Sequence, residues 1–182
     1  DEKSFIIRNE LFETTAKGVY VVGDASGKHM LQHAAAYEVN HLGKILLEEC
    51  TEPLHFKYMP HAVFTEPEIA SVGITEQKAK EKNIKYITST TNWLASAKAM
   101  STRLHYPVTK FLINPDNYEI LGCHMIGPES STMMHQVLAV MHINNDVRHI
   151  KEMLYIHPAL SEALLPAAVA AVKEVEKYNK KS

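Results

Sequence analysis

The spacing of apolar residues changes along the first third of the chain, and each change predicts a different element. Residues 19–24 form a short β-branched run that ends in glycine and aspartate, which predicts a buried strand followed by a turn at residues 25–28. From residue 30 to residue 50 apolar side chains recur every three or four positions, which predicts a long helix. The first fifty residues therefore predict a strand, a tight turn and a helix.

The rest of the chain alternates strand-like and helix-like blocks. Residues 51–60 contain two prolines and little periodicity, so we expect a linker and a domain boundary there. Strands are predicted at residues 62–64, 69–73, 84–91, 108–113 and 118–126, and helices at residues 75–80, 130–144, 146–153 and 160–178. This order predicts an α+β fold, a mostly antiparallel sheet with helices packed on it. We expect two parts, residues 1–50 and residues 55–182.

The composition is that of an ordinary globular protein and excludes several classes. The 182 residues are 46% apolar, and 19 Lys and Arg stand against 21 Asp and Glu, for a net charge of −2. This balance disfavours a nucleic-acid binder that neutralises phosphates, and no apolar run reaches the roughly 20 residues of a membrane-spanning helix. Two cysteines, Cys50 and Cys123, form neither a disulfide framework nor a CxxC motif, so we expect the reducing cytoplasm.

The first candidate site is Gly23-Asp24, between the predicted strand and the predicted helix. A carboxylate at the end of a strand accepts hydrogen bonds from sugar or polyol hydroxyls, and the following helix start offers free backbone N–H groups. The alternative is a strand-ending turn in which Asp24 only caps a helix. Spacing alone leaves both interpretations open.

The second candidate site is the segment from His157 to Glu162 at the start of the last predicted helix. Pro158 keeps His157 out of the helical region and therefore at the helix entrance. Glu162 lies where its carboxylate reaches one ring nitrogen, which sets the tautomer and raises the basicity of the other nitrogen, as a general acid/base requires. The alternative is a helix start whose glutamate complements the helix dipole.

Eleven histidines raise the question of a metal site. His29 and His33 have helical spacing, but no cysteine or carboxylate joins them at the spacing of a ligand set. His135, His142 and His149 recur every seven residues, but a break after residue 143 separates the third from the helix of the first two. We expect no metal; a histidine-based metalloprotein would instead carry stoichiometric zinc or nickel.

Four segments in order along the chain carry a resemblance to one family: residues 15–24 with residues 30–34 after them, residues 64–76, residues 120–127 and residues 157–162. They resemble the pyridine nucleotide–disulfide oxidoreductases, with dihydrolipoamide dehydrogenases as the most similar members, and the first segment resembles the second flavin-binding motif of that family. Residues 64–76 resemble the start of its C-terminal dimerisation domain, and residues 120–127 and 157–162 match its later landmarks. Together these segments cover nearly the whole chain.

The resemblance implies a role for each candidate residue. Asp24 would bind the ribityl chain of FAD, and Met30, Leu31, Gln32 and His33 would approach the flavin ring, largely through backbone. His157 and Glu162 would form a pair that reaches the redox dithiol of the other subunit of a homodimer, where the histidine moves a proton to and from the thiol. Residues 1–50 would be the end of the FAD domain, and residues 55–182 the dimerisation domain, with its interface on residues 133–143 and the last helix.

The family's other motifs are missing from this sequence. It has neither the GxGxxG flavin motif, nor the glycine motif for NAD(P), nor the redox pair CxxxxC. We therefore expect the C-terminal part of a longer enzyme that passes electrons between a small dithiol or disulfide substrate, FAD and NAD(P), and that is catalytically incomplete without the rest. The alternative is a freestanding dimerising module that has lost catalysis.

Overall fold

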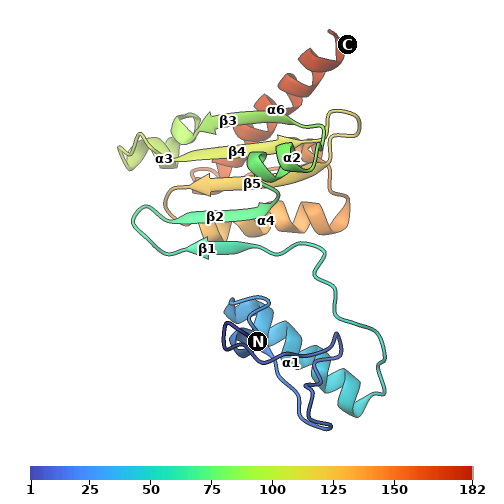
Figure 1. Cartoon of the computed structure of the whole chain (residues 1–182). Helices are drawn as coiled ribbons and strands as arrows, with labels where there is room; N and C mark the ends of the chain where they lie inside the picture. Colours follow the sequence, from blue (N-terminus) through green and yellow to red (C-terminus); the bar gives the residue numbers. More distant parts are fainter. Residues whose placement is uncertain (182) are drawn as a thin grey trace. The chain divides into compact units, whose positions relative to one another are not determined.

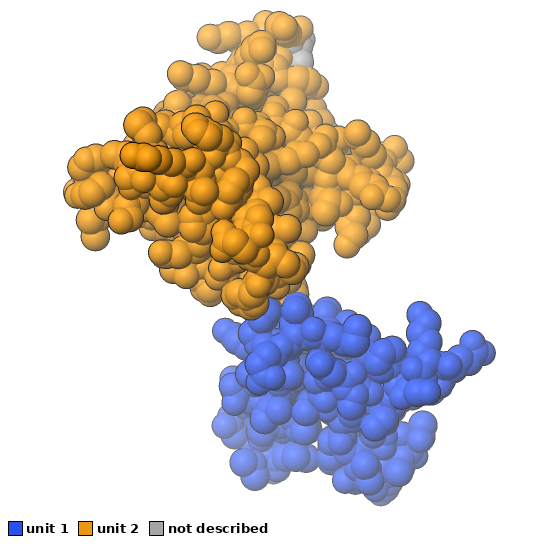
Figure 2. Space-filling view, turned by 90° about the vertical axis from the view of Figure 1, so that its left-hand side faces the viewer, with its two compact units in different colours: residues 1–57 blue, residues 58–182 orange. Residues whose placement is uncertain are grey.

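The chain forms two compact units, one ending at Lys57 and one beginning at Tyr58 (Figure 1 and Figure 2). The structure is a computed structural model and describes residues 1–181. Each unit has its own elements and packing, described in turn below. Among residues 1–181, no helix combines the length and the apolar character needed to cross a membrane.

The first unit contains one short 3-10 helix, η1 (Gly23–Ser26), and one long helix, α1 (Gln32–Leu47). The long helix confirms the periodicity of residues 30–50, but the strand predicted before it is wrong. Only Tyr20 forms a β-bridge there, with Glu13, and Val19 is exposed. The segment that ends at Glu13 lies opposite Tyr20, but it does not continue as a paired strand because Phe12 has a positive φ of 69° and turns the chain away.

A buried carboxylate ties this unit together. Glu38 on α1 accepts a hydrogen bond from the Arg8 guanidinium at 2.5 Å and another from the Gly23 N–H at 2.7 Å. The side chains of Arg8 and Glu38 are only 4% and 2% exposed. The pair therefore fixes the start of η1 against α1, and both charges depend on each other because neither reaches water.

The second unit is a five-stranded antiparallel sheet, which confirms the predicted α+β class (Figure 1). The spatial order is β1-β2-β5-β4-β3, and every neighbouring pair is antiparallel. The strands are β1 (His61–Val63), β2 (Ile69–Gly73), β3 (Ile87–Asn92), β4 (Val108–Ile113) and β5 (Ile120–Ile126). All five lie within or overlap the runs predicted from the sequence.

The helices of the second unit cover the sheet unequally (Figure 1). Two long ones, α4 and α6, pack on one face, and the short α2 lies over the other. The helical elements are α2 (Glu76–Glu81), η2 (Trp93–Ala95), α3 (Ala97–Ser101), α4 (Ser130–Ile143), α5 (Val147–Glu152), η3 (Leu160–Ala163) and α6 (Leu164–Asn179). The sequence predicted the last helix from residue 160, but its first turn is 3-10, with Glu162 bonded back to the Ala159 N–H.

The core lies between the sheet and the helices α4, α5 and α6. It takes the inward-facing residues of the central strands and the apolar faces of the three helices, including Val72, Phe111, Cys123, Met125, Met134, Val137, Met141, Ile150, Leu164, Ala168 and Val172. Side chains of this kind contribute about 1.5–3 kcal/mol each when fully buried. The second unit therefore has a closed core of its own.

The other face of the sheet carries a polar contact between β2 and β5. The ring of His124 accepts at Nδ1 from the Ser71 hydroxyl at 3.0 Å and donates from Nε2 to the Ile74 carbonyl at 3.1 Å. The carbonyl is an acceptor only, so Nε2 must carry the proton. Burial lowers the pKa of His124 below its ordinary 6.5, and the positive charge of Lys110 lowers it further. The hydrogen bond to the Ile74 carbonyl raises the pKa but does not outweigh burial.

We predict that the His124 contact makes folding pH-dependent. The folded chain keeps this imidazole neutral at pH values where the unfolded chain protonates it. The stability due to His124 is complete above about pH 6.5, falls as the pH drops through that value, and levels off below the folded pKa. Chemical denaturation between about pH 5 and pH 7 should show a flatter profile for His124→Gln, whereas His135→Gln, on the exposed side of α4, should keep the wild-type profile.

We also predict that the first unit depends on Glu38. Glu38→Ala leaves the Arg8 charge buried without a partner, which costs about 3–5 kcal/mol and should unfold this unit alone. Hydrogen exchange followed by mass spectrometry should show loss of protection in α1 while the sheet of the second unit stays protected. Glu10→Ala, an exposed carboxylate of the same unit, should change protection little; equal loss in both variants would contradict the prediction.

Candidate functional site

The segment between α5 and η3 carries His157 and is held by few but specific contacts. Residues 153–159 have no regular structure, and Tyr155 anchors them by donating its hydroxyl to the Ile150 carbonyl at 2.8 Å. Burial raises the pKa of Tyr155 to about 12, so the hydroxyl remains a donor at all physiological pH values. The segment therefore begins from a fixed point on α5 and ends at the first turn of η3.

The structure brings His157 and Glu162 together. Nδ1 of His157 lies 2.8 Å from Oε1 of Glu162, and Oε2 of the same carboxylate accepts from the Ala159 N–H at 2.8 Å. The side chain of His157 is 68% exposed, whereas that of Glu162 is 19% exposed. The carboxylate is thus held from two sides, and the imidazole projects from the surface.

These hydrogen bonds set the protonation states of the pair. The Ala159 N–H, and after it His157, lowers the pKa of Glu162 below its ordinary value. Glu162 is therefore a carboxylate at neutral pH and can only accept, so the proton of the neutral imidazole lies on Nδ1. Nε2 has no hydrogen-bond partner among residues 1–181 and presents its lone pair to the outside. This arrangement can accept a proton from a group docked against the protein surface and return it.

Two large apolar side chains in the loop just before His157 are strongly exposed, and sequence reasoning missed them. Leu154 is 100% exposed and Ile156 is 81% exposed. The sequence placed the interface on residues 133–143 and the last helix. Most apolar residues of these helices lie inside the unit, including Met133, Met134, Val137, Leu138, Met141, Ala168 and Val172, whereas Ile143 is 78% exposed. The signal for the exposed pair is two large apolar residues in a short loop that lacks helical spacing.

The candidate flavin residues all lie in the first unit, on the stretch from η1 to the start of α1. Asp24 is the second residue of η1, and its exposed carboxylate has no hydrogen bond within residues 1–181. Met30 and Leu31 precede α1 directly, Gln32 and His33 open it, and Met30, Gln32 and His33 are exposed. An exposed carboxylate beside a helix start can accept hydrogen bonds from hydroxyl groups, and the helix start offers free backbone N–H groups.

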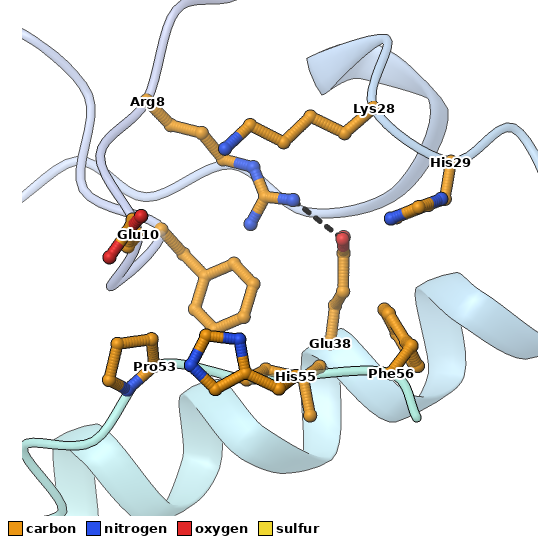
Figure 3. Close-up of a pocket in the computed structure, with 10 residues that line it drawn as sticks. Arg8, Glu10, Lys28, His29, Glu38, Pro53, His55 and Phe56 are labelled. Atoms are coloured by element: carbon orange, nitrogen blue, oxygen red, sulfur yellow. Dashed lines mark hydrogen bonds and ion pairs between the residues drawn. The ribbon is translucent and has the colours of Figure 1, made fainter. Parts of the chain in front are cut away.

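A pocket of about 160 Å³ opens in the same unit but does not contain these residues (Figure 3). Its lining includes Arg8, Lys28, His29 and Glu38 together with the segment from Pro53 to Phe56. The close-up shows the ion pair of Arg8 and Glu38 crossing it. Sequence reasoning missed this pair. Its signal was Glu38, a charged residue that lies four positions after the buried Ala34 and therefore on the buried face of α1.

The histidines and cysteines do not form a further reactive cluster in the described part of the chain. Within residues 1–181, no three side chains of the metal-binding types lie close enough to hold an ion. His29 packs against Phe56 instead, with ring centroids 5.3 Å apart. Both cysteines are free; Cys123 is buried in the core, which raises the pKa of its thiol, and Cys50 is partly exposed.

Comparison with known proteins identifies the family and the fold. A family model described as "Pyridine nucleotide-disulphide oxidoreductase, dimerisation domain" matches residues 59–168, more than half of the chain. The chain belongs to the pyridine nucleotide–disulphide oxidoreductase family. The match covers the sheet, α4 and α5 and reaches the first residues of α6, so the His157–Glu162 pair lies within the family's dimerisation domain.

Curated members of the family resemble the chain along most of its length. A dihydrolipoyl dehydrogenase of Buchnera aphidicola subsp. Acyrthosiphon pisum is 31% identical over 163 residues, which cover 88% of this chain and 34% of the relative. The chloroplastic dihydrolipoyl dehydrogenase 2 of Arabidopsis thaliana is 34% identical over 153 residues, which cover 80% of this chain and 26% of the relative. The chain thus spans about a third or less of the length of these family members.

Solved structures of family members share the fold. The HOCl-induced flavoprotein disulfide reductase RclA from Escherichia coli superimposes with a TM-score of 0.86 over 93% of this chain and 39% of its own, at 22% identity. LpdA from Mycobacterium tuberculosis gives a TM-score of 0.79 over 91% of this chain and 36% of its own, also at 22% identity. At this identity the superpositions establish the architecture and no more.

We predict that only one thiol of this family member reacts in the folded state. Cys123 is fully buried with a raised pKa, so it is both inaccessible and protonated, whereas Cys50 is accessible. Titration with a chromogenic disulfide should detect about one thiol per chain without denaturant and two in guanidinium chloride. Cys50→Ser should abolish the fast reaction; a fast reaction that persists in that variant would contradict the assignment.

Proposed function

We propose that His157 and Glu162 form the acid/base pair of a dithiol/disulfide oxidoreductase of the dihydrolipoamide dehydrogenase type, and that the pair acts on the redox dithiol of the partner subunit in a homodimer. The observation that supports this is the hydrogen bond between His157 Nδ1 and Glu162 Oε1 on an exposed imidazole. Glu162 fixes the tautomer, and Nε2 is left for a reacting group that this chain does not supply. Family membership supports the choice of reaction.

The proposed step is a proton transfer. Nε2 takes the proton of a thiol; the S–H bond breaks, an N–H bond forms, and a thiolate remains as the nucleophile for thiol–disulfide exchange. The carboxylate of Glu162 stabilises the imidazolium that results, because the Nδ1 hydrogen bond becomes charge-assisted. In the reverse step Nε2 returns the proton to the thiolate that leaves in the exchange. FAD, when bound in the complete enzyme, supplies the two-electron redox chemistry.

The first unit fits the end of a flavin domain, which we propose for residues 1–50. Asp24 would hold the ribityl hydroxyls, and the stretch from Met30 to His33 would face the ring. The uncovered apolar residues of α1 support this, since Tyr37, Val39, Leu46 and Leu47 are all exposed. A helix with this much apolar surface in water is expected where further protein packs on it. NAD(P) would bind in a part of the enzyme beyond this chain.

The exposed side chains of Leu154 and Ile156 support dimerisation through the loop that carries His157. Burying two such residues contributes about 3–6 kcal/mol in total and would bring the imidazole to the partner at the same time. We therefore propose that residues 153–157 lie at the centre of the dimer contact.

For catalysis we predict that His157→Gln in the full-length enzyme lowers kcat by about 10²–10⁴, the usual contribution of a general acid/base. Glu162→Gln should lower it less and shift the pH profile, because it removes the orienting charge and keeps the imidazole. Steady-state assay with a dithiol such as dihydrolipoamide measures both. His135→Gln, another exposed histidine, is the matched control; full activity of His157→Gln would overturn the proposal.

For assembly we predict a colourless dimer of this chain, about twice its mass of 20.5 kDa. Sedimentation together with a visible spectrum measures mass and flavin at once. Leu154→Asp with Ile156→Asp should give the monomer, whereas Leu47→Asp, equally accessible on α1, should not; a monomeric wild type contradicts the assembly. The alternative hypothesis, a freestanding dimerising module, predicts the same mass. The reading frame upstream of residue 1 distinguishes the two hypotheses, since a CxxxxC motif there supports the longer enzyme.

A further inference from the structure

Ser96 connects the helical segment after β3 to the loop that carries His157. Its hydroxyl donates to the Ala159 carbonyl at 3.1 Å and accepts from the Ala99 N–H at 3.4 Å, where it caps α3. Ser96 is only 1% exposed, so its hydroxyl cannot exchange these partners for water. The contact joins residues that are 63 positions apart in the sequence.

The segment around Ser96 is itself fixed to the sheet. Trp93 in η2 is buried, and its Nε1 donates to the Thr109 hydroxyl of β4 at 2.9 Å. Gly127 closes on the indole so tightly that a Cβ there would lie 2.7 Å from the ring. Both η2 and α3 also pack against η3. A continuous set of buried contacts therefore runs from β4 through Trp93 and Ser96 to the loop.

Ala159 is held on both sides of its Cα. Its N–H donates to Oε2 of Glu162. Its carbonyl accepts from the Ser96 hydroxyl at 3.1 Å and, at the longer distance of 3.4 Å, from the Glu162 N–H. Fixing both flanking peptide units leaves the φ and ψ of Ala159 little freedom. Because the same carboxylate of Glu162 binds His157, the orientation of the imidazole depends on where Ala159 points its N–H. Loss of the Ser96 contact would leave the Ala159 carbonyl with only the longer hydrogen bond from the Glu162 N–H and so weaken one of these two constraints.

We propose that Ser96 is a positioning residue for the His157–Glu162 pair: through the Ala159 carbonyl it holds the backbone that orients the carboxylate. The proposal deepens the acid/base function proposed above and rests on it for its biological meaning. Ser96 touches no reacting atom and acts only through Ala159 and Glu162. The coupling itself is a property of this chain and can be measured without catalysis.

The test uses Ser96→Ala and Ser96→Cys in the full 182-residue chain. Alanine removes the donor, and cysteine keeps about the same volume with a weak donor, so it decides the question if the alanine variant does not fold. Carbon-13 NMR titration should show the pKa of Glu162 rising by about 0.5 pH unit in both variants, since a charge-assisted hydrogen bond is partly lost. Nitrogen-15 shifts of the His157 ring should show less of the Nδ1–H tautomer.

A cap lost elsewhere provides the matched control. Thr75→Ala removes the hydroxyl that caps α2, so it carries a similar loss of stability of about 1 kcal/mol but lies outside the loop. Fluorescence of Trp93, the single tryptophan, reports that the segment is still packed. Two results would overturn the positioning role and leave the acid/base proposal standing. One is that the NMR signals of Glu162 and His157 stay unchanged in both Ser96 variants; the other is that they change equally in Thr75→Ala. The acid/base proposal is tested separately: it fails if His157→Gln keeps full activity in the complete enzyme.

Discussion

The geometry of the candidate site depends on one carboxylate. Each oxygen of Glu162 has a separate donor, the Ala159 N–H on one and the His157 ring on the other. The backbone donor fixes where the carboxylate lies, and the carboxylate then fixes which face and which nitrogen the imidazole presents. An exposed histidine without such a partner would sample several rotamers and both tautomers. The hydrogen bond from the backbone is therefore what makes a mobile side chain into an oriented one.

The two units differ in how completely they enclose their apolar residues. The second unit closes its core between the sheet and three helices, so a loop at its edge can be held rigidly by Ser96 and Tyr155. The first unit is short, and chains of such length bury a smaller share of their surface. It relies on the buried pair of Arg8 and Glu38 and leaves much of α1 uncovered.

Periodicity predicted the second unit well because its strands and helices each bury one face. The runs that became β2, β4, β5 and α4 confirm the antiparallel α+β class, and Thr75 and Asp146 cap α2 and α5 as their residue types suggest. The strand at residues 19–24 failed because a strand needs a neighbour, and the positive φ of Phe12 turns the neighbouring segment away. Nothing in a single segment's spacing reports the path of another.

The candidate site shows the same division. His157 and Glu162 are five positions apart, so the sequence could predict their contact from local geometry. Ser96 contacts Ala159 across 63 positions, and Arg8 contacts Glu38 across 30, so both depend on the folded chain. Family resemblance supplied the roles of Asp24 and the residues after it, and those roles stay predictions. The structure locates these residues on η1 and around the start of α1.

Stability does not account for the position of His157. An ion pair with one partner as exposed as this imidazole contributes little, since solvent screens it and the side chains lose freedom. Leu154, three residues before His157 in the loop, has a fully exposed side chain, which lowers solubility and adds no apolar packing to the core. Polar residues at positions 154 and 156 would keep a monomer more soluble. Exposed apolar residues in the same loop as an oriented, accessible Nε2 are what the proposed acid/base role at a dimer contact requires, since a second surface would cover these residues and bring the proton donor.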